Sequence, residues 1–194
     1  MKKLTRDDLY SLEKYNEIRN DFRKDVMAHK KNRQLQIGLH ARIYFENRVT
    51  MHYQIQEMLR AEKIFDAEGI QEELDAYNPL IPGGTNWKAT LTLEFPDPDE
   101  RAVWLAKLIG IDQKTWVQVD GFDKVYPISN EDLERETEEK TSSVHFMRFE
   151  LDPDMITAVK EGRDISVGIE HENYDYSVSP IPKNIRDSLA EDLI

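Results

Sequence analysis

The spacing of apolar residues predicts that the first part of the chain is mostly helical. Apolar residues recur every three or four positions over residues 9–18, 21–31 and 50–67, which is the spacing of one buried helix face. Residues 70–77 predict one more short helix. Between the second and third of these helices, residues 34–45 predict a short pair of β-strands.

The second part of the chain is predicted to mix strands and helices. Residues 87–95 alternate between apolar and polar side chains, as in a strand with one face in solvent. The dipeptide Asp120-Gly121 lies between two β-forming runs and predicts a tight hairpin. The other elements expected here are strands at residues 143–151 and 164–171 and helices at residues 99–108, 130–140 and 184–193, with a short helix after Pro153.

A loop rich in proline and glycine separates the two parts. Two prolines and two glycines exclude a helix from residues 78–86. We therefore expect a single domain over residues 1–194, with a mostly helical part at 1–77 and a mixed α+β part at 87–194. The one-sided strands and the hairpin predict an α+β fold, in which helices pack on one side of an antiparallel or mixed sheet and the N-terminal part is helical.

Composition narrows the classes of function. The chain has 26 basic and 38 acidic residues and a net charge of −12, so it is not expected to bind nucleic acid or an anionic membrane. It has no cysteine, which excludes disulfides, thiol nucleophiles and thiolate metal sites. No apolar run has the length of a signal peptide or a membrane span, so we expect a soluble cytoplasmic protein. The P-loop, dinucleotide-binding and hydrolase-elbow motifs are also absent from the sequence.

Two candidate metal ligands lie on the helix predicted at residues 50–67. Glu62 falls on the centre line of its apolar stripe, where a buried carboxylate would be paired with Arg42 or Arg48, protonated, or bound to a metal ion. Exposure near the end of the helix is the alternative. His52 flanks the same stripe and is either a pocket residue or a hydrogen-bonded residue at the boundary of the core.

Two further candidates, His145 and His171, end the apolar faces of two predicted strands. They would lie at the same sheet edge in antiparallel neighbouring strands, and about 20 Å apart in parallel neighbours. Imidazole and carboxylate groups bind divalent metal ions. His52, Glu62, His145 and His171 are therefore candidate ligands of a divalent metal cofactor. The alternative is that both histidines are hydrogen-bonded residues of the core.

Residues 19–48 form the one net-basic block of the chain, with eight Lys or Arg residues and three acidic residues. Within it, Lys30, Lys31 and Arg33 lie close together beside His29. These residues are candidates for docking an acidic partner or for binding a phosphate or carboxylate group. The alternative is that they only offset the acidic remainder of the chain.

Several separated segments of the chain, in order, carry a family resemblance: residues 4–9, 28–31, 53–60, 73–82 and 143–150. Over essentially the whole chain, they resemble a bacterial family catalogued as a domain of unknown function (DUF 3501). The resemblance implies no reaction and no site residues. Genes of this family are commonly found beside those of a rubrerythrin-like protein and an iron–sulfur oxidoreductase, so the resemblance implies a role in a redox or peroxide-handling module.

Two functions are therefore expected from the sequence. The first is an accessory or binding protein that docks a redox partner, with the rubrerythrin-like protein and the iron–sulfur oxidoreductase as candidate partners. The second is a metal- or haem-dependent redox enzyme that uses histidine and carboxylate ligands. Close approach of two histidines and a carboxylate would favour the enzyme, whereas scattered, hydrogen-bonded histidines would favour the accessory protein.

Overall fold

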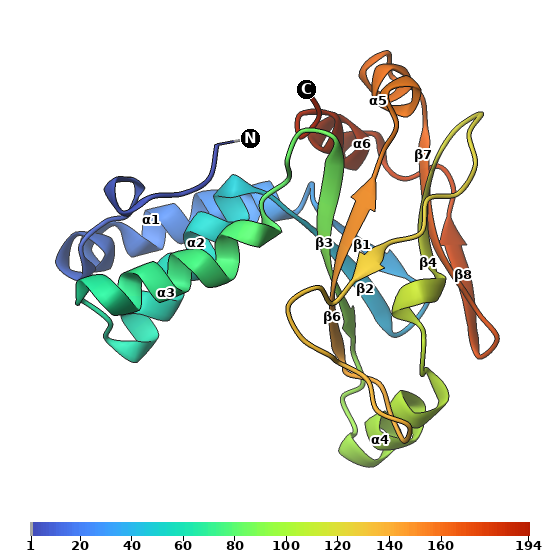
Figure 1. Cartoon of the computed structure of the whole chain (residues 1–194), viewed down its shortest axis with the longest axis horizontal. Coiled ribbons are helices and arrows are strands. Elements are labelled where there is room, and N and C mark those ends of the chain that lie inside the picture. Colours follow the sequence, from blue (N-terminus) through green and yellow to red (C-terminus); the bar gives the residue numbers. More distant parts are fainter. Residues whose placement is uncertain (1) are drawn as a thin grey trace.

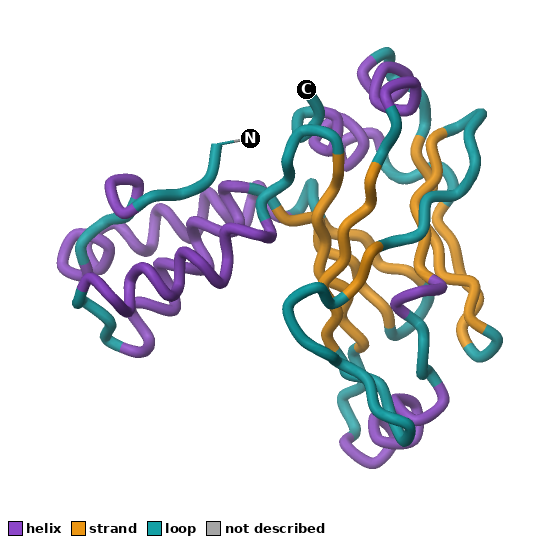
Figure 2. The backbone as a smooth tube through the Cα atoms, viewed as in Figure 1, coloured by secondary structure: helices purple, strands orange, loops and turns teal. Residues whose placement is uncertain are grey.

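The computed structural model describes residues 2–194, which form a helical arm and a β-sheet body (Figure 1). We call the N-terminal segment and helices α1 to α3 the arm, and the strands with helices α4 to α6 the body. Figure 2 shows the same division, with the helices of the arm on one side and the strands of the body on the other. No helix within residues 2–194 combines the length and the apolar character needed to cross a bilayer.

The arm consists of three helices that begin at capping side chains. Ser11, Asn47 and Asp66 each accept hydrogen bonds from backbone N–H groups in the first turn of the helix that follows. Its elements are η1 (Arg6–Asp8), α1 (Leu12–Lys30), α2 (Arg48–Glu62), α3 (Ala67–Tyr77) and η2 (Asn78–Leu80). The arm has a small core of its own, made by Leu4, Met51, Ile55, Leu59, Leu74 and Ile81.

Polar contacts also hold α1 against α2. The Glu57 carboxylate accepts two hydrogen bonds from the Arg19 guanidinium, both at 2.8 Å, and a third from the Tyr15 hydroxyl at 2.6 Å. The Arg19 guanidinium lowers the pKa of Glu57 and keeps it ionised. Helix α1 is continuous where the sequence predicted two helices, because no proline or glycine interrupts residues 12–30.

The body consists of two antiparallel sheets. The first contains β1 (Gln34–Ile37), β2 (Ala41–Glu46), β3 (Asn86–Leu93), β6 (Val144–Glu150) and β5 (Ile128–Ser129), in that spatial order. The second contains β4 (Thr115–Val119), β7 (Ile165–His171) and β8 (Tyr174–Val178). Helices α5 (Pro153–Lys160) and α6 (Lys183–Ala190) lie at one end of the body and α4 (Pro98–Lys107) at the other (Figure 1).

One continuous apolar core joins the two sheets. Trp87 and Phe149 from the first sheet and Val117 and Val167 from the second are fully buried in it. The burial of these apolar faces supplies the main driving force for the arrangement. The Tyr174 hydroxyl of the second sheet also ties down the β1–β2 turn, because it donates to the Ile37 carbonyl at 2.7 Å and accepts from two N–H groups of that turn. Those N–H groups belong to His40 and Ala41.

The α+β class, the antiparallel strands and the helical N-terminal part are confirmed. The acidic helix predicted at residues 130–140 is absent, and this segment is a loop with a single β-bridge between Glu136 and Thr141. Leu133 is its one large apolar side chain and is exposed, so a helix here would have no face to bury. The turn at Gly121 forms with φ +87°, but the chain after it makes an isolated β-bridge with β4, at Val125, in place of the predicted hairpin strand, and then pairs with β6.

Candidate functional site

The two body histidines do not meet. His145 lies on β6 of the first sheet and is fully buried. Its Nε2–H donates to the Ser142 carbonyl at 3.0 Å, and its Nδ1 accepts from the Asn130 side-chain amide at 3.2 Å. The same amide donates to the Asp112 carboxylate at 3.2 Å. Burial lowers the pKa of His145, so the ring is neutral and both of its nitrogens have partners.

His171 is at the end of β7 in the other sheet and is 7% exposed. Its Nε2–H donates to the Ile109 carbonyl at 2.9 Å, and its Nδ1 accepts from the Asn173 N–H at 3.2 Å. Both ring nitrogens are therefore occupied in this histidine as well. The strands that carry the two histidines belong to different sheets, so neither the antiparallel nor the parallel arrangement of neighbouring strands applies to them.

The two arm candidates are also separate from them and from each other. His52 stacks on Tyr10 at 5.6 Å between ring centroids and packs edge-on against Phe22 at 5.3 Å. Its Nε2 is buried without a hydrogen-bond partner, and burial lowers the pKa of the ring. Glu62 is the last residue of α2 and is exposed, because the helix ends there and Lys63 adopts a left-handed conformation with φ 57°.

Within residues 2–194, no three His, Asp or Glu side chains are grouped so that they could share a metal ion. His52, Glu62, His145 and His171 therefore do not form one site. For Glu62, the structure agrees with the alternative of exposure near the end of the helix: Phe65, which defined the apolar stripe, lies beyond that end and is 79% exposed.

The structure divides the predicted basic block. Arg33 is 2% exposed, so it does not reach a partner. Its guanidinium pairs with the buried Asp192 carboxylate and donates to the carbonyls of Phe45 at 2.8 Å and Ser188 at 3.1 Å. The sequence could not indicate this role, because Asp192 lies 159 residues further along the chain.

Four other basic residues form a continuous surface on α1, which we call the basic stripe. Arg23 and Lys30 are seven residues apart, as are Lys24 and Lys31, so each pair is separated by two helical turns on the same side of the helix. Arg23, Lys24 and Lys31 are exposed, and Lys30 is half-buried with its Nζ 5.4 Å from the Tyr53 ring centroid. None of the four takes part in an ion pair within residues 2–194.

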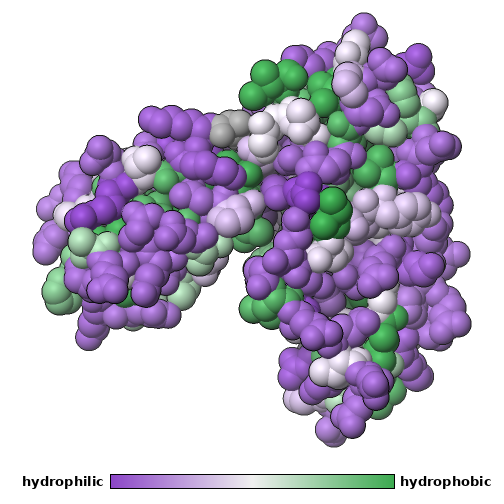
Figure 3. All heavy atoms as spheres, viewed as in Figure 1, coloured by the Kyte–Doolittle hydropathy of each residue, from purple (hydrophilic) through white to green (hydrophobic). Residues whose placement is uncertain are grey.

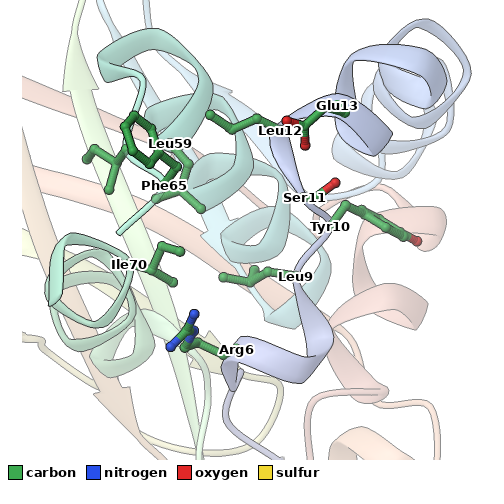
Figure 4. Close-up of a pocket in the computed structure, with 10 residues that line it drawn as sticks. Arg6, Leu9, Tyr10, Ser11, Leu12, Glu13, Leu59, Phe65 and Ile70 are labelled. Atoms are coloured by element: carbon green, nitrogen blue, oxygen red, sulfur yellow. The ribbon is translucent and has the colours of Figure 1, made fainter. Parts of the chain in front are cut away.

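The tip of the arm carries a groove of about 390 Å³ (Figure 4). Leu9 and Ile70 point toward each other across it, whereas the Tyr10 ring points away. Phe65 lies on its rim and Arg6 stands at one end. The apolar spacing of the sequence does not predict this groove. The one signal is the position of Phe65 directly before the Asp66 cap, which places an apolar residue outside a helix.

Comparisons with known proteins place the chain without assigning it an activity. The chain is similar to a protein of unknown function from Burkholderia pseudomallei K96243, whose crystal structure covers 100% of both chains at 48% sequence identity and a TM-score of 0.95. No curated protein matches the chain. Residues 3–193 match the family described as "Protein of unknown function (DUF3501)". The chain therefore belongs to the DUF3501 family.

Proposed function

We propose that this protein is an accessory protein that docks an acidic partner through the basic stripe of α1. One observation carries the proposal: four neighbouring cations, which have no ion pair with any of residues 2–194, lie on one helix face of a protein whose net charge is −12. Placing like charges together is unfavourable in the free protein. An acidic surface on a partner would remove that repulsion, and it would also be steered toward the stripe by long-range attraction.

The helix dipole accounts for only part of the stripe. Lys30 and Lys31 are at the C-terminal end of α1, where a cation offsets the negative end of the dipole. Arg23 and Lys24 are near the middle of the helix, where the dipole gives no such stabilisation. These two residues are the best support for a role in binding.

The position of the arm suits this role. The arm projects from the body (Figure 1), so a partner can contact α1 without displacing the sheets or the buried core. Asp21 and Asp25 are the acidic residues in the C-terminal half of α1, residues 21–30. Neither makes an ion pair with the basic stripe in the part of the chain that the structure describes. The cations are therefore available to an external carboxylate.

The candidate partners come from the family's gene neighbourhood. A rubrerythrin-like protein and an iron–sulfur oxidoreductase are the first proteins to test, which would make this chain part of a redox or peroxide-handling module. The chain has no cysteine, so it cannot hold an iron–sulfur cluster with thiolates of its own. In this proposal, the partner performs the electron transfer and the accessory protein stabilises or regulates it.

Isothermal titration of the purified protein with each candidate partner, at low and at moderate salt, tests the proposal. The double variant Arg23→Glu/Lys24→Glu is compared with Lys140→Glu/Lys160→Glu, which makes the same change in net charge at two exposed lysines of the body. We expect a complex that weakens with salt, and a loss of affinity of at least about tenfold in the stripe variant alone. Absence of binding to both partners at both salt concentrations, or equal weakening in the two variants, would overturn the proposal.

A further inference from the structure

A cleft of about 270 Å³ lies where the arm meets the outer face of the five-stranded sheet. Figure 3 shows the molecule hollowed between the arm and the body. The arm contributes Ala76, Pro79 and Leu80 to the walls, and β6 contributes Phe146 and Met147. Most of the surface that lines the cleft is therefore apolar.

Lys88 of β3 lines this cleft and has no partner of its own. Its cross-strand neighbours are Arg148 on β6 and Glu46 on β2. Arg148 binds Glu131 through two hydrogen bonds at 2.9 and 2.7 Å, and Glu46 accepts from the Thr50 hydroxyl at 2.6 Å. No ion pair or side-chain hydrogen bond involves the Lys88 ammonium within residues 2–194.

The other charged groups of the cleft do not neutralise Lys88 either. Glu131 is held by Arg148, Asp132 pairs with Arg135 at 2.5 Å, and Asp75 accepts from the Gln71 amide at 2.8 Å. Arg148, the like-charged neighbour across the strands, is itself paired with Glu131 and Glu150, so these two carboxylates are engaged by Arg148 and not by Lys88. Burial, more than any neighbouring charge, lowers the pKa of Lys88; Arg148 lowers it further, whereas the carboxylates of Glu131 and Glu150 raise it.

We propose that this cleft binds a small organic carboxylate, with its anionic group against Lys88 Nζ and its hydrocarbon part against Phe146 and Leu80. A partly buried ammonium and a carboxylate form a charge-assisted hydrogen bond, which is stronger than a bond between neutral groups. The apolar walls favour a ligand with a hydrocarbon body over inorganic anions. Because the volume lies just below the roughly 300–1,000 Å³ of drug-sized pockets, the ligand is an aromatic or short-chain monocarboxylate. Binding of a carboxylate in this cleft does not require a partner docked on α1.

Titration with benzoate, followed by the backbone amide resonances of the wild-type protein, tests the site. Benzamide is the matched uncharged probe of the same shape. We expect benzoate to shift the amides of residues 76–78, 80 and 146–148, and benzamide to bind at least about tenfold more weakly. Equal binding of the two probes, shifts centred elsewhere, or no shifts would overturn the proposal.

The variant Lys88→Met removes the charge and keeps a side chain of similar length. Lys114→Met is the matched control, because Lys114 is an exposed lysine outside the cleft. We expect Lys88→Met to raise the Kd for benzoate at least about tenfold and the control to leave it unchanged. An unchanged Kd in a folded Lys88→Met protein would overturn the proposal, and the wild-type comparison of benzoate with benzamide decides the matter if this variant does not fold.

Discussion

The arm and the body use their polar residues in opposite ways. In the body, Arg33, His145 and His171 are buried, and each is bound to several groups of the same chain. In the arm, the basic stripe faces solvent and has no internal ion pairs, and the core behind it is small. In the body, these histidine and arginine side chains therefore stabilise the fold instead of forming a reactive site. On the arm and at its junction with the body, the basic stripe and Lys88 have no ion pair within residues 2–194, so their charges are available to other molecules.

The largest expected effect comes from the buried ion pair of the body. Arg33→Met leaves the Asp192 carboxylate buried and unpaired and removes the donors that satisfy two carbonyls. We expect a loss of about 3–5 kcal/mol in the free energy of unfolding, measured by urea denaturation. Arg163→Met is the control, because its pair with Asp120 is exposed and should contribute less than about 1 kcal/mol. Equal losses in the two variants would contradict a structural role for Arg33.

The contact between the two sheets should give a smaller effect. Tyr174→Phe removes a buried hydroxyl and leaves the N–H groups of His40 and Ala41 and the Ile37 carbonyl without that partner. We expect the free energy of unfolding to fall by about 1–3 kcal/mol. Tyr10→Phe is the control, because this tyrosine is exposed and its hydroxyl has no hydrogen-bond partner within residues 2–194, so less than about 0.5 kcal/mol is expected. A change below that value for Tyr174 would show that its hydroxyl does not hold the β1–β2 turn.

The pH dependence of stability tests the structural use of His145. Burial keeps its folded-state pKa below the ordinary value of 6.5, so the unfolded chain binds a proton first as the pH falls. The free energy of unfolding should therefore decrease on acidification from about pH 7.5 to about pH 5.5. His145→Gln cannot take up that proton, so we expect a shallower decrease in parallel urea titrations. An identical slope in the variant would show that His145 does not contribute.

The smallest effect is expected at the basic stripe. Arg23→Glu/Lys24→Glu alters exposed side chains without ion pairs, so the free energy of unfolding should change by less than about 0.5 kcal/mol. Thermal unfolding of the variant and the wild type provides the measurement. A loss of more than about 1 kcal/mol would mean that the stripe stabilises the arm and would remove the contrast between the two regions.

Local patterns in the sequence were enough to predict many of the elements. The alternation at residues 87–95 identified β3, because one face of that strand is buried and the other faces solvent. The helices at both ends of the chain followed from their apolar spacing. Strand β8 was not predicted, because Tyr174 is its one fully buried residue and gives no alternating pattern.

The arrangement of the side chains depends on contacts that are distant in sequence. The separation of His145 from His171 follows from the presence of two sheets, and the lack of a partner for Lys88 follows from the register of β3 with β6. The burial of Arg33 depends on the C-terminal Asp192. The basic stripe could be predicted from the sequence, because its residues within 23–31 have helical spacing. Proximity along the chain identified Lys30 and Lys31 but joined them to the buried Arg33, whereas the helix face joins them to Arg23 and Lys24.

Hydrogen–deuterium exchange on the complex with the rubrerythrin-like protein tests the central claim most directly. Exchange is compared for the free protein and the protein in the presence of saturating partner. The account predicts added protection in the segment that carries the basic stripe, residues 20–31 at the C-terminal end of α1. It predicts unchanged exchange in the strands that carry His145 and His171. Protection confined to the body, or no added protection anywhere on the arm, would contradict it.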